Sequence, residues 1–174
     1  MDMRSVIFFL ALLPLGLLSA CASYSGYGLK PGVSNIDDVE RVMGQPAMRW
    51  QNADHSAQLA YPRGPSGLHT YMAFIGPDGK LQSIDNVLDP KFFARIQPGT
   101  TKEEVLRTLG PPGWTTHYTN RDTLEWEWRF CNVFNEAQRF DVLFDNTTGT
   151  VRSTQSPPGD RLGWCTRRPC ICSH

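Results

Sequence analysis

The sequence predicts an α+β fold of two tandem units, in each of which one or two short helices pack on a small three-stranded antiparallel sheet. Three observations predict it: a helix motif that occurs twice, a hairpin pattern that occurs twice, and a globular composition with 40% hydrophobic and 20% charged residues. The 17 basic and 17 acidic residues leave no formal net charge. Nucleic-acid binders need a surplus of cations against phosphate, so we expect no nucleic-acid partner.

The N-terminus has the pattern of a secretory signal. A short cationic start is followed by an almost wholly apolar run over residues 5–18. A transmembrane helix needs about 20 apolar residues, so this run is too short for a comfortable span. It ends in a Leu-Ser-Ala-Cys segment, 18–21, which resembles the bacterial lipobox. The resemblance implies cleavage before Cys21 and lipidation of its thiol, so residues 1–20 would be a lipoprotein signal peptide.

The lipobox resemblance also implies a destination. Two or more acyl chains anchor a protein stably in a bilayer. Ala22 follows the cysteine, and a residue other than Asp at this position implies sorting to the outer membrane in Gram-negative bacteria. Residues 21–28, rich in Ser, Tyr and Gly, are expected to form a flexible tether. The alternatives are a plain signal peptide with an incidental cysteine and an N-terminal membrane anchor.

A helix motif opens each unit. Both copies read apolar-x-Pro-Gly, a cap, acidic residues, an apolar stripe and a closing Gly-x-Pro. In the first copy Asn35 is the expected N-cap and Gly44 ends the helix. In the second copy Thr101 caps, Glu104 three residues later completes a capping box, and Gly110 ends the helix. Helices of two or three turns are marginal alone, so both must pack on another element.

A strand–turn–strand pattern follows each helix motif. Phe74 and Gly79 recur 70 residues later as Phe144 and Gly149, so the two hairpins share one frame. A further strand precedes each hairpin, and the one in the first unit is weaker because Pro62 limits its hydrogen bonding. The predicted strands cover residues 58–62, 71–75, 80–84, 123–130, 140–144 and 150–153.

A third short helix is expected over residues 89–96, because Asp89 can cap it and Pro90 suits its first turn. It would open the second unit. The predicted organisation is a first unit over residues 29–88, a second unit over residues 89–160 and a Cys-rich tail over residues 161–174.

The lipobox, the Pro-Gly-Thr-Thr-Lys-Glu-Glu-Val-Leu-Arg-Thr-Leu-Gly-Pro-Pro motif at 98–112, the aromatic strand and the hairpin together resemble the SmpA/OmlA/BamE family of outer-membrane lipoproteins. The resemblance covers about residues 29–155, and the segments 61–65 and 69–72 resemble two-copy members. It implies an accessory or scaffold lipoprotein in envelope integrity or β-barrel assembly. The layout is also similar to the β-lactamase inhibitory proteins, which bind through a sheet face. The chain differs from BamE in its second unit and its tail.

Four cysteines remain after Cys21, and they are Cys131, Cys165, Cys170 and Cys172. An exported chain meets an oxidising compartment, so disulfides are the default. Four cysteines allow three pairings, of which we favour a bridge from Cys131 to one tail cysteine. The alternative is a metal site made by the tail cysteines and His174, whose spacing matches no common zinc pattern. We therefore predict no metal and no cofactor.

The sequence holds no nucleophile elbow, P-loop or dinucleotide fingerprint, and we predict no enzyme activity and no catalytic residue. Glu125 and Glu127 point the same way on a predicted strand and offer a carboxylate pair for hydrolysis. The simpler interpretation places them on the wet face of a sheet. Aromatic and Arg side chains are typical of binding faces, and Trp50, Tyr61 and Arg63 are the expected exposed set.

These observations predict an outer-membrane-anchored, periplasm-facing lipoprotein that acts as a protein-interaction scaffold in envelope integrity or outer-membrane protein assembly. Its expected partners are barrel-assembly components. The alternative is a periplasmic enzyme inhibitor of the β-lactamase-inhibitory type. A third, weaker interpretation is a hydrolase or metal binder that uses the Cys-rich tail.

Overall fold

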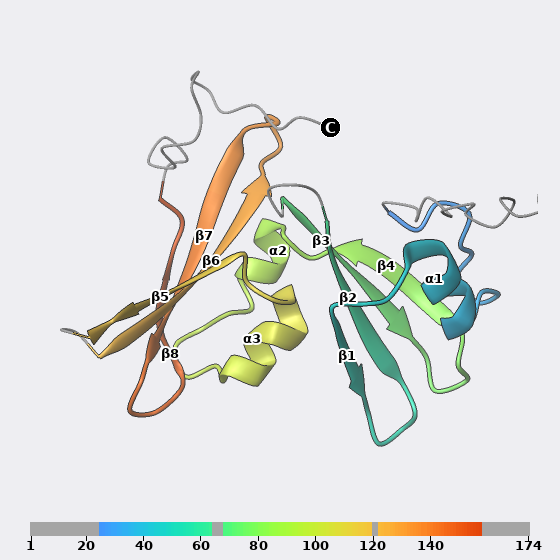
Figure 1. Cartoon of the computed structure of the whole chain (residues 1–174), viewed down its shortest axis with the longest axis horizontal. Helices are drawn as coiled ribbons and strands as arrows, with labels where there is room; N and C mark the ends of the chain where they lie inside the picture. Colours follow the sequence, from blue (N-terminus) through green and yellow to red (C-terminus); the bar gives the residue numbers. More distant parts are fainter. Residues whose placement is uncertain (1–24, 64–67, 120–121, 158–174) are drawn as a thin grey trace, which may run out of the picture.

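The computed structural model describes residues 25–63, 68–119 and 122–157 as two four-stranded antiparallel sheets and three short helices (Figure 1). Strands follow one another in chain order across each sheet, β1 to β4 in the first and β5 to β8 in the second. The elements are α1 (Ile36–Met43), β1 (Met48–Gln51), β2 (Ala57–Arg63), β3 (His69–Ile75), β4 (Leu81–Asn86), α2 (Pro90–Phe93), α3 (Lys102–Leu109), β5 (Trp114–Tyr118), β6 (Thr123–Cys131), β7 (Ala137–Asp145) and β8 (Val151–Gln155).

The predicted α+β fold of two tandem units is confirmed, but each sheet has four strands where the sequence predicted three. The additional strands are β1 and β5, which lie at one edge of each sheet and follow closely on the glycine that ends the preceding helix. All five residues of β5 are exposed, and β1 has only four residues. Neither strand therefore carries the long alternating pattern by which a half-buried strand is recognised.

The helix ends follow the predicted capping chemistry. The Asn35 side chain accepts a hydrogen bond from the Asp38 backbone N–H at 2.9 Å, and the Asp38 carboxylate accepts one from the Asn35 N–H at 3.0 Å. Thr101 and Glu104 exchange the same pair of bonds at 3.2 Å and 2.8 Å. Both helices therefore begin with a capping box, which satisfies two otherwise unpaired backbone donors.

The two units join helix to sheet in the same way. In each unit the N-cap residue forms an isolated antiparallel bridge with the residue just before the last strand, Asn35 with Lys80 and Thr101 with Thr150. The shared hairpin frame places Lys80 and Thr150 at equivalent positions, 70 residues apart. The repeat seen in the sequence is thus a repeat of tertiary contacts as well.

The two sheets share one apolar core. Trp50 and Met72 from the first sheet belong to the same buried cluster as Trp128 and Phe144 from the second. Helices α2 and α3 lie between the sheets, and α1 covers the other face of the first sheet (Figure 1). The Phe93 ring of α2 stacks on a ring of β7, with 4.2 Å between centroids. The inner faces of both sheets are therefore buried against the same two helices.

A second buried cluster lies between α1 and the first sheet. It contains Val39 and Met43 from the helix and Leu59, Tyr61 and Ile75 from the strands. Among the described residues there is no helix with the length and apolar character that a membrane crossing requires.

Candidate functional site on the second sheet

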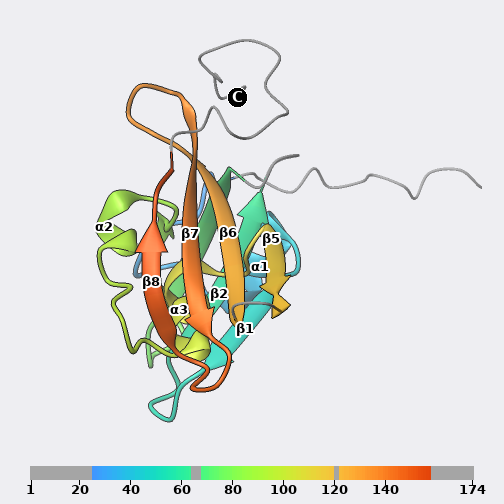
Figure 2. The ribbon, with the colours of Figure 1, turned by 90° about the vertical axis from the view of Figure 1, so that its left-hand side faces the viewer.

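The second sheet has one face that no described helix covers, and we call it the outer face (Figure 2). Alternation along β6 sends its apolar side chains into the shared core and its charged side chains to this face. The strand pairing sets Glu127 opposite Trp114 on one side and Asp141 on the other, and sets Arg129 opposite Arg139. Directly paired residues lie on the same face of a sheet, so these side chains meet.

An ion-pair network runs across the outer face. Glu127 accepts hydrogen bonds from Arg129 Nε at 2.8 Å and from Arg139 Nη1 at 3.3 Å. Arg139 Nη2 lies 2.8 Å from Asp141 Oδ2, so the network continues on β7. The Arg129 guanidinium also stacks on Trp114, 3.5 Å from the ring centroid. Cations over an indole face are attracted to its π electrons, and the stack holds the exposed Trp114 ring in place.

The acidic side chains of this face are more buried than the sequence suggested. Asp141 has no exposed surface and Glu125 is 9% exposed. Burial raises the pKa of Asp141 to about 6, against the opposing effect of Arg139, and the nearby charges of Glu125 and Glu127 raise it further. The expectation that Glu125 and Glu127 lie on a wet face is therefore wrong, because both side chains are largely shielded from solvent.

Three carboxylates of the face lie close enough to consider a metal site. One oxygen from each of Glu125, Glu127 and Asp141 lies within 4.8 Å of the others. However, Glu127 and Asp141 are already paired with guanidinium groups. A metal ion would have to displace those cations, so the arrangement is that of an internal ion network.

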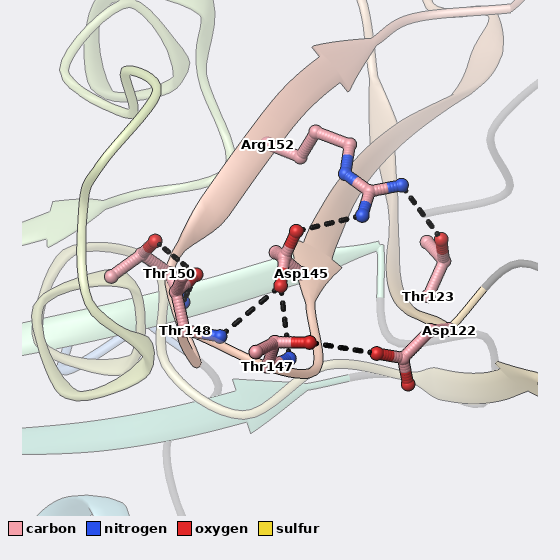
Figure 3. Close-up of polar contacts among 7 residues, drawn as sticks. All are labelled: Asp122, Thr123, Asp145, Thr147, Thr148, Thr150 and Arg152. Atoms are coloured by element: carbon pink, nitrogen blue, oxygen red, sulfur yellow. Dashed lines mark hydrogen bonds and ion pairs between the residues drawn. The ribbon is translucent and has the colours of Figure 1, made fainter.

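A polar clamp fixes the end of the outer face where the β5–β6 and β7–β8 turns meet (Figure 3). Thr147 Oγ1 donates to Asp122 Oδ2 at 2.9 Å and thereby joins the two turns. Arg152 donates to Asp145 at 2.7 Å and to Thr123 at 3.2 Å. The hydrogen bond from Arg152, with backbone N–H groups from the turn, lowers the pKa of Asp145. The clamp is structural, and it joins the β5–β6 turn and the start of β6 to the β7–β8 hairpin.

The residues predicted to form an exposed binding set lie elsewhere. Trp50 is 7% exposed in the shared core, and Tyr61 is 1% exposed under α1. The expectation that both are exposed is wrong, because Trp50 faces the shared core and Tyr61 faces α1. Arg63 is partly buried, donates to the Met43 carbonyl and lies over the Tyr61 ring. Trp50 and Tyr61 therefore contribute to stability, and Arg63 closes the C-terminal end of α1.

Only one of the five cysteines, Cys131, lies among the residues that the structure describes. Cys131 ends β6 and is disulfide-bonded. The other cysteines, Cys21, Cys165, Cys170 and Cys172, lie outside the described residues, as does His174. The pairing of Cys131 with a tail cysteine and the lipidation of Cys21 stay predictions.

The large apolar side chains that the structure leaves exposed were not predicted from the sequence to form the binding surface. They include Trp114 at 45% and Tyr118 at 39% on the outer face, and Val133 at 92% and Phe134 at 79% in the β6–β7 turn. The turn carried a usable signal, since two adjacent apolar residues stand between asparagines in a segment that reverses the chain. The β5 residues carried none, because their exposure depends on which edge of the sheet they occupy.

The chain matches no protein-family model and no curated protein. It is similar to a solved structure described as an osmotically inducible lipoprotein, OsmE, with 22% identity over 51% of this chain and 87% of that one, at a TM-score of 0.34. It is also similar to a structure from Streptococcus mutans described as a β-lactamase inhibitor protein, with 15% identity over 72% of this chain and 83% of that one, at a TM-score of 0.33.

Proposed function

We propose that the chain is a lipid-anchored, non-catalytic lipoprotein that binds another protein of the cell envelope through its outer face. Residues 1–20 would direct export and Cys21 would carry the acyl chains in the outer membrane. The bound protein would be a component of β-barrel assembly or of envelope integrity, and the chain would serve as a scaffold beside the bilayer.

The observation that carries the proposal is the pair of exposed aromatic side chains on the outer face. Trp114 and Tyr118 are partly exposed on this face, which no described helix covers, and Arg129 holds the indole ring in place. Protein interfaces are enriched in Trp, Tyr and Arg. Side chains that are already ordered lose little entropy on binding, which favours affinity. The ion-pair network thus holds the Trp114 side chain in a fixed orientation before a partner binds.

Photo-crosslinking tests the binding face. A benzoylphenylalanine at position 114 should form adducts with barrel-assembly components in intact cells. The same group at Val33, an exposed apolar position on the first unit, is the control and should form few. An adduct with a soluble periplasmic enzyme would instead support the inhibitor interpretation. Equal labelling from both positions would show that the outer face is not the binding surface.

Fractionation tests the anchor separately. Cys21→Ser removes the thiol that lipidation requires, so the variant should leave the outer-membrane fraction. Retention of Cys21→Ser in that fraction would refute the lipid anchor and leave the crosslinking result unaffected.

A further inference from the structure

The β6–β7 turn projects two large apolar side chains into solvent. Val133 is 92% exposed and Phe134 is 79% exposed. The other described turns between strands have polar tips, Asn-Ala-Asp-His-Ser at 52–56, Pro-Asp-Gly at 77–79 and Asn-Thr-Thr-Gly at 146–149. We call residues 132–136 the apolar tip. Apolar side chains in water are unfavourable, so this exposure suggests that the tip is covered in the working protein.

Hydrogen bonds within the apolar tip define the path of its backbone. The Asn132 side chain accepts hydrogen bonds from the backbone N–H groups of Phe134 and Glu136, both at 2.9 Å. The Asn132 side-chain amide donates a hydrogen bond to the Glu136 carboxylate at 2.9 Å. The one acidic side chain of the tip is therefore paired where the tip joins the strands. Asn135 adopts a left-handed conformation with φ of 60°, which closes the turn. These contacts hold Val133 and Phe134 outward.

The strand ends that carry the apolar tip, at Cys131 in β6 and Ala137 in β7, are also held in place. Ala137 is buried at the start of β7, in contact with Leu68 and Cys131. Cys131 is disulfide-bonded where β6 ends. The apolar tip therefore extends from a fixed support, and its side chains need little ordering when they are buried.

The apolar tip and the first described residues lie toward the same end of the molecule. Figure 1 shows the β6–β7 turn at the top and the first described residues, in blue, in the upper half of the view, whereas the β7–β8 turn lies at the bottom. Only three residues lie between Cys21 and Ser25, the first residue that the structure describes, which makes four Cα–Cα steps. An extended chain of that length reaches at most about 14 Å. An anchor at Cys21 would hold this end of the molecule against the bilayer.

We propose that the apolar tip inserts Val133 and Phe134 into the interfacial region of the lipid bilayer and forms a second membrane contact beside the acyl chains. The inference rests on the lipid anchor of the proposed function. The two contacts lie at separate points of the molecule, so together they fix its orientation and present the outer face to a partner at a set height above the membrane.

Fluorescence quenching tests the insertion directly. The lipidated chain is reconstituted in vesicles of phosphatidylethanolamine and phosphatidylglycerol that contain lipids brominated along the acyl chain. The variants are Phe134→Trp and, as a matched control at an exposed aromatic position, Tyr118→Trp. The parent chain, with its five native tryptophans, is measured alongside and its quenching is subtracted. The remaining quenching should be at least twofold stronger for Phe134→Trp than for Tyr118→Trp. Equal quenching at both positions would overturn the proposal.

A second measurement keeps this test independent of the anchor. An unacylated chain that begins at Ala22 is floated with the same vesicles. Replacing both Val133 and Phe134 with Ser should lower its partition about tenfold or more, because two apolar side chains no longer leave water. The control Trp114→Ser should leave the partition unchanged. An equal loss in both variants, or no loss, would overturn the insertion.

The outcomes separate the two proposals. If Cys21→Ser stays with the outer membrane while quenching at 134 persists, the anchor is wrong and the membrane contact of the tip stands. If the anchor holds and quenching at 134 is absent, only the tip insertion is wrong. Self-association of the unacylated chain that is abolished by Val133→Ser would identify a second copy as the occupant and would also overturn the membrane contact.

Discussion

Arg139 and Asp141 lie two residues apart on β7, with 2.8 Å between the guanidinium and a carboxylate that has no exposed surface. The contact does not fully compensate for the burial of the charge. The pKa of Asp141 stands at about 6 because desolvation outweighs the attraction of Arg139. Within the described part of the chain, the Oδ1 atom of this carboxylate also has no hydrogen-bond partner.

The raised pKa of Asp141 gives a prediction about pH. An acid with a higher pKa in the folded state binds its proton more tightly there, so its contribution to stability is lost as the pH rises through the folded value. Asp141→Asn removes that titration. The free energy of unfolding of the variant, relative to the parent, should therefore increase by about 2 kcal/mol between pH 4.5 and pH 7.5. Urea unfolding at both pH values measures the difference.

The exposed Thr116 in β5 offers the control for this experiment. Thr116→Ala removes no titratable group, so it should shift the free energy of unfolding by nearly the same amount at both pH values. If Asp141→Asn behaved likewise, the carboxylate would be ionised without penalty in the folded protein, and the ion network would have to be reinterpreted.

The two capping boxes should contribute similarly to stability. Asn35→Ala and Thr101→Ala each remove the acceptor for a backbone N–H in the first turn of a helix. Each substitution should lower the free energy of unfolding by about 1 kcal/mol. Thr116→Ala on the exposed strand β5 is the control and should have a smaller effect. Thermal or urea unfolding provides the measurement, and a silent Thr101→Ala would contradict the capping assignment.

Gly110 is predicted to be the more sensitive of two matched glycines. It has φ of 74°, and a Cβ there would come within 2.8 Å of a buried Thr70 methyl on the first sheet. Gly149 has φ of 73° with open space around it. Ala at either position meets the left-handed strain of about 1 kcal/mol. Gly110→Ala should lose about a further 1–2 kcal/mol by overpacking. Equal losses would mean that the units are not packed closely at this point.

Substitution of Phe93 tests whether the shared core unfolds in a single cooperative transition. Its ring packs on Phe140 and Phe130, with centroid separations of 4.2 Å and 4.8 Å. Phe93→Ala should lower the free energy of unfolding by about 3–5 kcal/mol. The exposed Phe134→Ala should change it by less than about 0.5 kcal/mol. Circular dichroism should show a single transition for both variants, and two separate transitions would contradict a common core.

Local signals explain what could be predicted from the sequence. The helices after Asn35 and Thr101 have a cap, an apolar stripe and a terminating glycine, all within ten residues. The hairpins have turn glycines between alternating strands. Such features depend on neighbours in sequence, so the fold class and the tandem arrangement follow from them. The edge strands β1 and β5 could not be predicted, because their residues do not alternate between buried and exposed positions over a sufficient length.

The candidate site depends on contacts between distant segments, which local patterns do not specify. Trp50 is buried because α3 and the second sheet cover it, 50 and more residues further along the chain. Asp141 is buried because β6 and β8 supply side chains around it. A sequence alone shows an aromatic or an acid at such positions and gives no measure of how much of it other segments will cover.

The common core has a consequence for biogenesis. A nascent polypeptide emerges from the ribosome with its amino end first, so Trp50 and Met72 emerge well before Val151, which belongs to the same buried cluster. Until then the apolar inner face of the first sheet has no second sheet to bury it. We expect folding of this chain to depend on a chaperone that shields the first sheet until the second has been synthesised.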